Sequence, residues 1–259
     1  MRSINELDFG RISKLKYILC DIDDTLTTHG KLTAEAYTAL WRLHDSGFSV
    51  IPVTGRPAGW CDLIIREWPV KAVVGENGAF VFYTENNQIR SFVHPSVAGD
   101  NVRAGLEEVK NACLKAVPGC RVAKDQFSRI YDLAIDFNED PPYLGLDAAQ
   151  EIKNVCASFG AQAKISSIHV NAWFGDYDKL QMTRLFLSEV LKEENILEKC
   201  IFFGDSPNDE PMFSFFPNSC AVANILPFVD TIHHLPAFVT DHEGGKGFNE
   251  AITRILLHK

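Results

Sequence analysis

No two of the seven cysteines stand at C-x-x-C spacing, and no apolar run is long enough to cross a membrane. An odd number of cysteines without such pairs makes a disulfide framework or a zinc site unexpected. The longest apolar run, residues 220–229, is broken by Asn224 and Pro227 and falls short of a bilayer span. Residues 1–14 are polar and mixed in charge, which predicts no signal peptide. With reduced thiols, these absences predict a cytoplasmic protein without a membrane partner.

Positive charge is also scarce. Lysine and arginine number 25 against 34 aspartates and glutamates, which leaves a formal net charge of −9. Nucleic acid and anionic membranes attract proteins through basic surfaces, so neither is expected as a main partner. A small anionic substrate is still compatible with this net negative charge, because a bound cation and a few basic groups can make the local charge positive. With 46% hydrophobic residues among 259, the chain can bury one large core or two smaller ones.

Short, continuous apolar runs predict strands that are buried on both faces, as in a parallel sheet. They are Tyr17–Cys20, Phe48–Val53, Lys71–Val74, Cys200–Phe203 and Ser219–Val222. Helical patterns lie between them, at residues 33–46, 57–68 and 179–192. This alternation predicts an α/β fold with a Rossmann-like parallel sheet. Pro52 cannot donate to a sheet ladder, so we expect an irregularity or a strand end there.

The middle of the chain has a different order of elements, which predicts a smaller α+β domain inserted into the α/β core. From residue 82 onwards the patterns indicate a hairpin, a helix, a half-exposed strand, a second helix and a closing pair of strands. The ranges after the hairpin are 101–116, 131–137, 144–159, 163–165 and 168–173. We expect residues 1–84 and 175–259 to form the core and residues 85–174 the insertion, with hinges near 83–87 and 174–178.

Polar side chains follow three of the predicted core strands at the point where each strand ends. These segments are Asp21-Ile22-Asp23-Asp24-Thr25, Thr54-Gly55-Arg56 and Gly204-Asp205-Ser206-Pro207-Asn208-Asp209. Ligands of open α/β sheets bind at the carboxyl ends of the strands, so we expect these segments to share one pocket. Mg²⁺ prefers oxygen ligands and uses one or two carboxylates, which Asp21 and Asp205 can supply. Lys179, at the start of a predicted helix, is the cation that would balance them.

Each segment alone has an ordinary structural explanation, because an aspartate at a strand end often caps a turn or a helix. A calcium-binding EF-hand loop starting at Asp21 fails, since its sixth and twelfth positions hold Leu26 and Leu32 rather than Gly and Glu. A pair of glycosidase carboxylates is conceivable, but it leaves Lys179 and Thr54 without a role. Phosphoryl transfer needs a nucleophile, an acid or base, and positive charge, and the combined set offers all three.

The same segments, taken in order, resemble the four motifs of the haloacid-dehalogenase-like (HAD) superfamily of phosphotransferases. The motifs match Asp21–Leu26, Thr54 within Val53–Arg56, Lys179, and Gly204–Asp209. About 125 residues separate Thr54 from Lys179, which leaves room for the α/β cap that one subgroup carries between its second and third motifs. Other segments resemble sugar-phosphate phosphatases, such as those for sucrose phosphate and mannosyl-3-phosphoglycerate. They are Gly75–Ala79, Gly204–Phe213 and Gly247–Ile252.

The resemblance implies a magnesium-dependent phosphatase that acts on a small-molecule phosphate ester, a sugar phosphate in particular, through an aspartyl phosphate. It makes Asp21 the nucleophile and Asp23 the general acid and base. Mg²⁺ would bind Asp21, the backbone carbonyl of Asp23, and Asp205. The substrate contacts would come from Thr54, Gly55, Arg56, Lys179 and Asn208, with Thr25 and Asp209 in support.

The cap implied by the resemblance should close over the substrate and read the leaving group. His169, Asn171 and Trp173 are candidates for this contact, although Trp173 also suits packing at the hinge. Asn77 is a further candidate contact in the core. Two other functions stay open: a sugar phosphomutase with the same cap, and a non-catalytic phospholigand-binding regulator.

Overall fold

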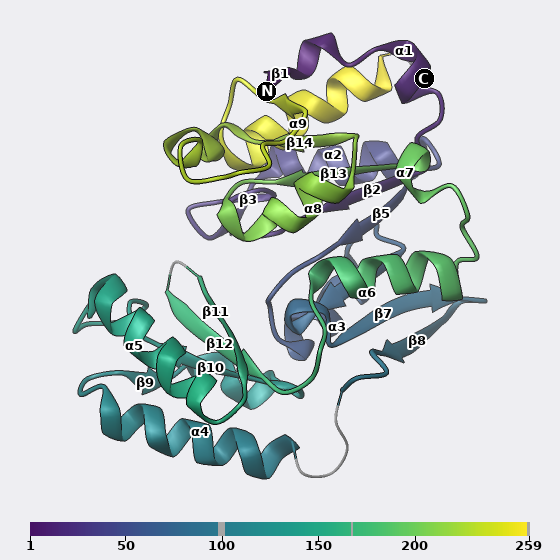
Figure 1. The fold of residues 1–259 in the computed structure, drawn as a ribbon. Helices are drawn as coiled ribbons and strands as arrows, with labels where there is room; N and C mark the ends of the chain where they lie inside the picture. The colour runs from purple at the N-terminus through teal and green to yellow at the C-terminus, as the bar shows by residue number, and fades with distance from the viewer. Residues whose placement is uncertain (98–101, 167, 258–259) are drawn as a thin grey trace.

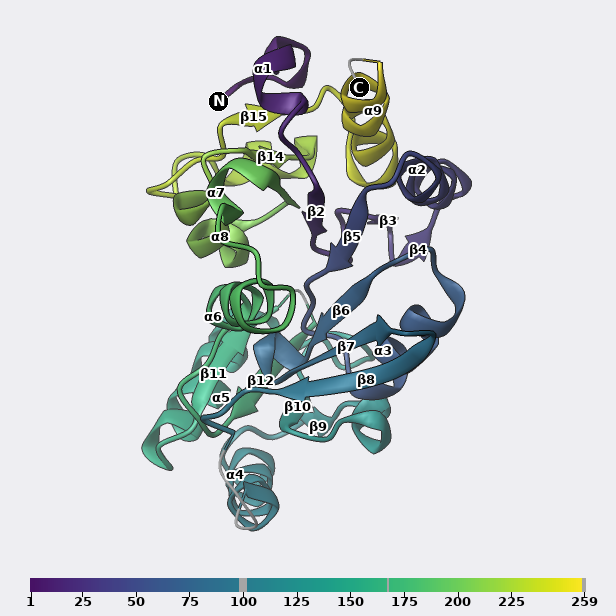
Figure 2. The same cartoon turned by 90° about the vertical axis from the view of Figure 1, so that its right-hand side faces the viewer.

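A computed structural model gives the fold of the chain and describes residues 1–97, 102–166 and 168–257. It contains two bodies, one built around a long parallel sheet and the other around a short antiparallel sheet with two helices (Figure 1). Both ends of the described chain belong to the first body and lie far from the second (Figures 1 and 2). Among the described residues, no helix combines the length and the apolar character that crossing a membrane requires.

The first body contains a six-stranded sheet in the order β1-β15-β14-β13-β2-β5, and all its pairings are parallel. This confirms the predicted α/β fold with a Rossmann-like parallel sheet. The strands are β1 (Arg2–Ser3), β15 (Phe238–Val239), β14 (Ser219–Ala221), β13 (Cys200–Gly204), β2 (Tyr17–Cys20) and β5 (Ser49–Pro52). The last two strands at one end of the sheet, β1 at the edge and β15 beside it, have no counterpart among the predicted strands, because two residues carry no periodic signal.

The strands of this sheet are buried on both faces because helices cover each side. On β2, Ile18 and Cys20 contribute to one apolar core, and Tyr17 and Leu19 contribute to the other. The helices beside the first core are α2 (Ala34–Asp45), α3 (Ala58–Glu67) and α9 (Gly244–Leu256), and those beside the second are α6 (Lys179–Leu185) and α8 (Glu210–Phe215). The continuous apolar runs in the sequence follow from this two-sided burial.

The sheet continues beyond β5 through a single parallel bridge. β5 ends at Pro52, where the missing N–H would interrupt the ladder, and Val53 then pairs with Val74. Val74 belongs to a second, three-stranded sheet made of β6 (Ala72–Gly75), β7 (Phe80–Glu85) and β8 (Gln88–Val93). The strand predicted at residues 71–74 is therefore β6, which lies beside β5 in parallel. On its other side β6 pairs with β7, and this pairing is antiparallel rather than parallel as predicted.

The second body has its own four-stranded antiparallel sheet, in the order β11-β12-β10-β9, and its own apolar core. Its elements are α4 (Val102–Ala116), β9 (Arg121–Val122), β10 (Asp132–Asp136), α5 (Gly145–Ser158), β11 (Gln162–Ile165) and β12 (His169–Trp173). Asn101, the predicted first residue of the first helix, lies outside the described residues. The expectation that β10 is half exposed is wrong: β10 is buried throughout, because its face opposite the helices turns towards the first body.

The hairpin formed by β7 and β8 helps to locate the boundary between the two bodies in the sequence. Because β8 pairs along its length with β7, residues 88–93 continue the sheet of the first body. We therefore propose that the insertion begins after residue 93, and not at residue 85 as the sequence patterns suggest. Its other limit, near residue 174, falls between β12 and α6.

Short elements complete the first body. They are α1 (Phe9–Ile12), β3 (Thr27–Thr28), β4 (Lys31–Leu32) and α7 (Ile196–Lys199). A π-helical turn at Phe186–Val190 extends α6, so the two together span most of the helix predicted at residues 179–192.

Candidate active site

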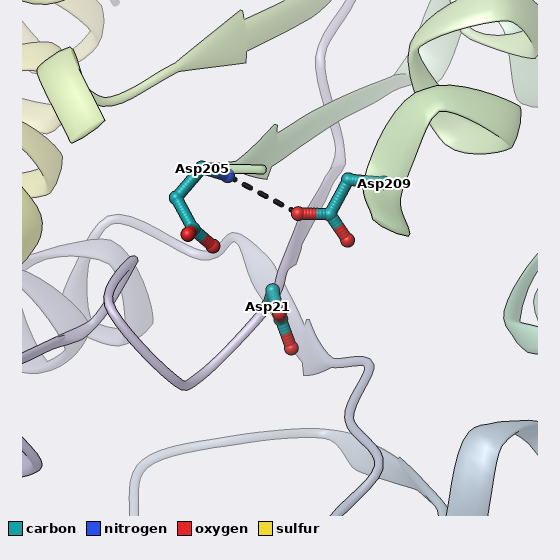
Figure 3. A group of neighbouring side chains, drawn as sticks. All are labelled: Asp21, Asp205 and Asp209. Carbon is teal, nitrogen blue, oxygen red and sulfur yellow. Dashed lines mark hydrogen bonds between the residues drawn. The ribbon is translucent and has the colours of Figure 1, made fainter. Parts of the chain in front are cut away.

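Three aspartates, Asp21, Asp205 and Asp209, lie side by side at the carboxyl edge of the parallel sheet (Figure 3). Each offers one carboxylate oxygen, and these oxygens all lie within 4.8 Å of one another. All three residues are buried, with exposed fractions of 7% or less. The N–H of Asp205 donates to Oδ2 of Asp209 at 3.1 Å, which is the dashed line in Figure 3. A preorganised set of carboxylate oxygens suits a hard divalent cation.

Strand pairing explains why Asp21 and Asp205 meet, since each follows the last residues of adjacent parallel strands. Cys20 pairs with Phe203, and the N–H of Asp21 donates to the carbonyl of Phe203 at 2.9 Å. The hydroxyl of Thr25 donates to Oδ1 of Asp205 at 3.1 Å and so ties the loop after β2 to the loop after β13. The register of two neighbouring strands thus fixes two of the three carboxylates.

The start of α6 supplies the cation of this group. Nζ of Lys179 lies 3.1 Å from Oδ1 of Asp21 and 3.4 Å from Oδ1 of Asp209. The side chain of Asp178 accepts the N–H of Gln181, and this cap fixes the point at which the helix begins. Lys179 is itself buried. One ammonium beside three carboxylates leaves the group with an excess of negative charge.

The electrostatics of the site reflect this excess. Burial raises the pKa of Asp21 to about 7 and the pKa of Asp205 to about 9, because ionised carboxylates lose their hydration there. Asp209 adds to both rises, while Lys179 opposes them. Burial works against the charged form of Lys179, yet its pKa lies above the ordinary value because Asp21 and Asp209 surround it. A divalent cation would allow all these carboxylates to ionise together, so the residues present fit Mg²⁺.

Thr54 follows the strand next to β2 and reaches the same edge of the sheet. It is fully buried. The N–H of Val53 donates to the carbonyl of Cys20 at 2.8 Å, which holds this segment beside the loop that carries Asp21. Oγ1 of Thr54 accepts the N–H of Arg56 at 3.1 Å. The structure therefore brings Thr54, Lys179 and the aspartates to one place, although they are far apart in the sequence.

Asp23 is not part of this carboxylate group. Its side chain is 57% exposed, and Nη2 of Arg56 lies 2.7 Å from its Oδ1. Nε of Arg56 adds contacts of 3.3 and 3.2 Å to the two carboxylate oxygens. The guanidinium also lies over the ring of Trp60, 4.4 Å from its centroid. Arg56, which the sequence predicted to contact the substrate, is thus held by Asp23. The third side chain of the carboxylate group is that of Asp209, for which the sequence suggested a supporting role.

The turn after β6 lies against Gly55. Asn77, in this turn, is buried with a φ of 57°, and its N–H donates to the carbonyl of Thr54 at 3.1 Å. A Cβ on Gly55 would lie 3.0 Å from Oδ1 of Asn77, so glycine permits this close approach. Nδ2 of Asn77 has no hydrogen-bond partner among the described residues. A buried donor beside Thr54 is therefore available to a ligand.

Glu76 joins the two bodies. Its carboxylate accepts the backbone N–H of Ala58 at 2.9 Å, from the start of α3. It also accepts the N–H groups of Ile130, Tyr131 and Asp132 at 2.9, 2.6 and 3.1 Å, from the segment that enters β10. Burial and the neighbouring Asp132 raise the pKa of Glu76 to about 7, although these amides favour its charged form. This carboxylate holds the second body over the strand ends of the first.

The three candidates in β12 all have partners within the protein. Nε2 of His169 lies 2.9 Å from Oε2 of Glu139, and Nδ2 of Asn171 donates to Asp132 at 3.2 Å. The ring of Trp173 stacks on Tyr177 with centroids 5.7 Å apart and belongs to a core of the first body. Trp173 therefore packs at the hinge, and the sequence patterns did not separate that role from substrate contact.

β11 contributes a residue that no sequence motif singled out. Lys164 lies opposite Asn171 in the strand register, on the sheet face turned away from α4 and α5. Its Nζ donates to the backbone carbonyl of Asn208 at 2.7 Å. Burial, together with Lys179, lowers the pKa of Lys164 to about 8. The only signal in the sequence was its alternation with Ala163 and Ile165, which pack towards the helices.

The chain is similar to known proteins in both sequence and fold. The family model of haloacid dehalogenase-like hydrolases matches residues 18–111 and 184–251, which include Asp21, Thr54 and Asp205 but not Lys179. No curated protein matches the sequence. A solved structure from Thermoplasma acidophilum shares 20% sequence identity, with a TM-score of 0.74, over 94% of this chain and 99% of that chain.

Two further solved structures have the same fold. A phosphatase of the HAD enzyme superfamily from Bacteroides thetaiotaomicron is 17% identical, with a TM-score of 0.65, over 94% of this chain and 96% of that chain. A sugar phosphatase of HAD subclass IIB is 14% identical, with a TM-score of 0.66, over 93% of this chain and 99% of that chain. Because the family model matches more than half of the chain, this protein belongs to the haloacid dehalogenase-like hydrolases.

Proposed function

We propose that the protein is a magnesium-dependent phosphatase that hydrolyses a small organic phosphate through an aspartyl phosphate on Asp21. The observation that carries the proposal is the buried carboxylate group with Lys179 at 3.1 Å from Asp21. Burial removes competing water, and the lysine offers positive charge where phosphoryl oxygens would gather. Membership of the hydrolase family supports the same reaction class.

Asp21, Asp205 and Asp209 are the side chains that would hold Mg²⁺. The set of ligands implied by the resemblance also includes the backbone carbonyl of Asp23, and this ligand remains part of the proposal. When bound, Mg²⁺ neutralises the carboxylates and polarises a phosphoryl oxygen. Lys179 would then bind a second phosphoryl oxygen while it keeps Asp21 in place. Thr54 and the unpartnered Nδ2 of Asn77 would contact the remaining oxygens.

The reaction would have two steps. In the first, an oxygen of Asp21 bonds to phosphorus, the bond to the leaving oxygen breaks, and Asp23 gives that oxygen a proton. In the second, Asp23 takes a proton from water, the water oxygen bonds to phosphorus, and the bond to Asp21 breaks. Before the reaction Asp23 is paired with Arg56, and this pairing would orient its carboxylate towards the leaving group. Asp21 ends the cycle as a free carboxylate.

The substrate we propose is a sugar phosphate. Support comes from segments that resemble sugar-phosphate phosphatases and from the fold shared with a sugar phosphatase of subclass IIB. The second body contacts Glu76 and Asn208, which follow strands of the first body, and from there it would exclude water and contact the leaving group. We also infer a cytoplasmic location from the seven free, buried cysteines.

The test is release of inorganic phosphate from 4-nitrophenyl phosphate and a panel of sugar phosphates, with Mg²⁺ and with EDTA. We expect turnover with Mg²⁺, loss of turnover with EDTA, and recovery when Mg²⁺ is returned in excess. An isomeric sugar phosphate without free phosphate would identify a phosphomutase instead. Binding of phosphate esters without any turnover would point to the regulator.

A further inference from the structure

Among the described basic groups around the site, Lys164 stands apart because it has no carboxylate partner. Lys179, Arg56 and Arg129 each lie within 3.1 Å of an aspartate oxygen. Across residues 1–97, 102–166 and 168–257, no carboxylate oxygen lies within 4.0 Å of Nζ of Lys164. Its hydrogen-bond acceptor is the neutral backbone carbonyl of Asn208, at 2.7 Å. The positive charge of Lys164 is therefore not balanced by direct contact.

An ammonium in this position is costly to keep without a counter-ion. Removing a cation from water is unfavourable unless an anion or a full set of hydrogen bonds replaces the hydration. The lowered pKa of Lys164 has this origin, since burial and Lys179 outweigh the more distant Asp209 and Asp21. Lys164 is only partly buried and borders an open hollow, so an anion supplied from outside the chain can reach it and would offset this cost.

The position of Lys164 indicates which part of a substrate that anion would be. It belongs to the second body, while the carboxylate group and Lys179 belong to the first. Its partner Asn208 lies in the loop between Asp205 and Asp209, so the ammonium stands at the edge of the catalytic group. A substrate whose phosphate meets Asp21 would extend its leaving group towards the second body.

There is room beside Lys164 for such a group. A hollow of about 410 Å³ is bordered by Lys164, Asn208, Glu210 and His234, among others. The carboxylate of Glu210 already accepts N–H groups from the segment at His234 and lies 3.1 Å from Nδ1 of that residue. Asp21 is not part of its lining, so a group bound in this hollow would not be the one that meets Asp21.

We propose that Lys164 selects phosphate esters whose leaving group carries a second negative charge, a carboxylate or a second phosphate. This inference rests on the proposed phosphatase function and narrows its substrate class. The ammonium would exchange its contact with the carbonyl of Asn208 for an ionic hydrogen bond to the leaving group. Neutral sugar phosphates would be turned over without that contact.

The experiment compares matched substrates that differ at one carbon. 3-Phosphoglycerate and 6-phosphogluconate carry a carboxylate where glycerol 3-phosphate and sorbitol 6-phosphate carry a hydroxymethyl group. Fructose 1,6-bisphosphate against fructose 6-phosphate tests a second phosphate in the same way. The readout is the ratio of kcat/KM within each pair, for the native protein and for Lys164→Gln.

We expect the native ratio to favour the doubly charged member in at least one pair. Lys164→Gln should lower that ratio roughly 10- to 100-fold, as expected for loss of one ionic hydrogen bond. Lys153→Gln, at an exposed lysine of α5, is the matched control and should keep the native ratio. The carboxylate and phosphate pairs identify which second anion is read.

Two results would overturn the proposal. In the first, Lys164→Gln lowers kcat/KM equally for both members of every pair, which would place Lys164 on the transferred phosphate. In the second, the ratios stay unchanged, which would make Lys164 a contact between the two bodies. Failure of the phosphatase proposal looks different, because the native protein would then release no phosphate even from 4-nitrophenyl phosphate.

Discussion

Nζ of Lys179 lies 3.1 Å from Oδ1 of Asp21, and in the sequence the two residues flank the second body. Asp21 depends on the end of β2, and Lys179 depends on the start of α6, which is the first helix after the second body. The elements of the second body therefore lie between these two residues in the sequence without separating the two charges in space. Both residues are buried, so substituting either one tests the contribution of this contact to activity and stability.

Asp21→Asn should abolish phosphate release while leaving the fold intact. An amide does not take up the phosphoryl group, so no covalent intermediate can form. We expect activity below about a hundredth of the native value, with an unchanged circular dichroism spectrum. Asp230→Asn, at an exposed position, is the control and should remain active. Near-native turnover by Asp21→Asn would contradict the covalent route.

Asp23→Asn should slow turnover by roughly 10²–10⁴-fold, because the leaving oxygen and the attacking water would lose their proton donor and acceptor. Arg56→Lys keeps the charge but loses the forked contact with Asp23, so its effect should be smaller. Steady-state kinetics on 4-nitrophenyl phosphate and on an alkyl phosphate would measure both. 4-Nitrophenolate is a better leaving group and needs less proton transfer, so Asp23→Asn should slow the hydrolysis of 4-nitrophenyl phosphate less than that of the alkyl phosphate. Equal losses on the two substrates would remove Asp23 from the acid role.

Lys179→Met should destabilise the fold and also lower the activity. Removing one partner of a buried ion pair costs about 3–5 kcal/mol, because the remaining charge is left without compensation. Here Asp21 and Asp209 would both lose their cation. Thermal unfolding without metal should show a clear fall in Tm, and added Mg²⁺ should restore part of it. Lys153→Met is the exposed control, and an equal Tm for the two variants would argue against a buried pair.

The stability of the metal-free protein should fall as the pH rises from about 4, near the unfolded pKa of the aspartates, to about 9, the folded pKa of Asp205. The folded pKa values of Asp21 and Asp205, about 7 and about 9, lie above the ordinary value of 3.8. The folded protein therefore keeps protons that the unfolded chain has released, and this stability disappears as the pH rises through the folded pKa values. Mg²⁺ binds the ionised carboxylates, so the gain in Tm from Mg²⁺ should increase over the same range. Thermal scans with EDTA and with Mg²⁺ test this, and the fall in stability between about pH 7 and 9 should disappear in Asp205→Asn while the part due to Asp21 remains.

Glu76→Gln should weaken the attachment of the second body. The carboxylate accepts four backbone N–H groups, and an amide would turn a donor towards some of them. We expect a loss of about 1–3 kcal/mol in the free energy of unfolding. Hydrogen exchange at residues 130–132 should also accelerate, which distinguishes local detachment from a general loss of stability. Glu151→Gln, at an exposed site on α5, should leave both measurements unchanged.

The parts that could be predicted from sequence are those set by local patterns and by parallel-strand geometry. The apolar run of β2 marks a strand buried on both faces, and Asp21 then falls at the strand end where parallel sheets bind ligands. The contact of Asp23 with Arg56 could not be foreseen, because it depends on side-chain directions in two loops. The pairing of β8 with β7 and the position of Lys164 depend on contacts between strands, for which a single sequence has no direct signal.

The second body packs α4 and α5 on its sheet around an apolar core of its own, which is distinct from the two cores that hold the strand ends of the first body. Residues such as Lys164 and Asn171 occupy the opposite face of that sheet, so they can change without disturbing either set of packed side chains. We therefore expect relatives with this architecture to differ on that face while the proposed reaction centre stays the same. Exchange of the whole insertion between such relatives is the corresponding route for protein engineering.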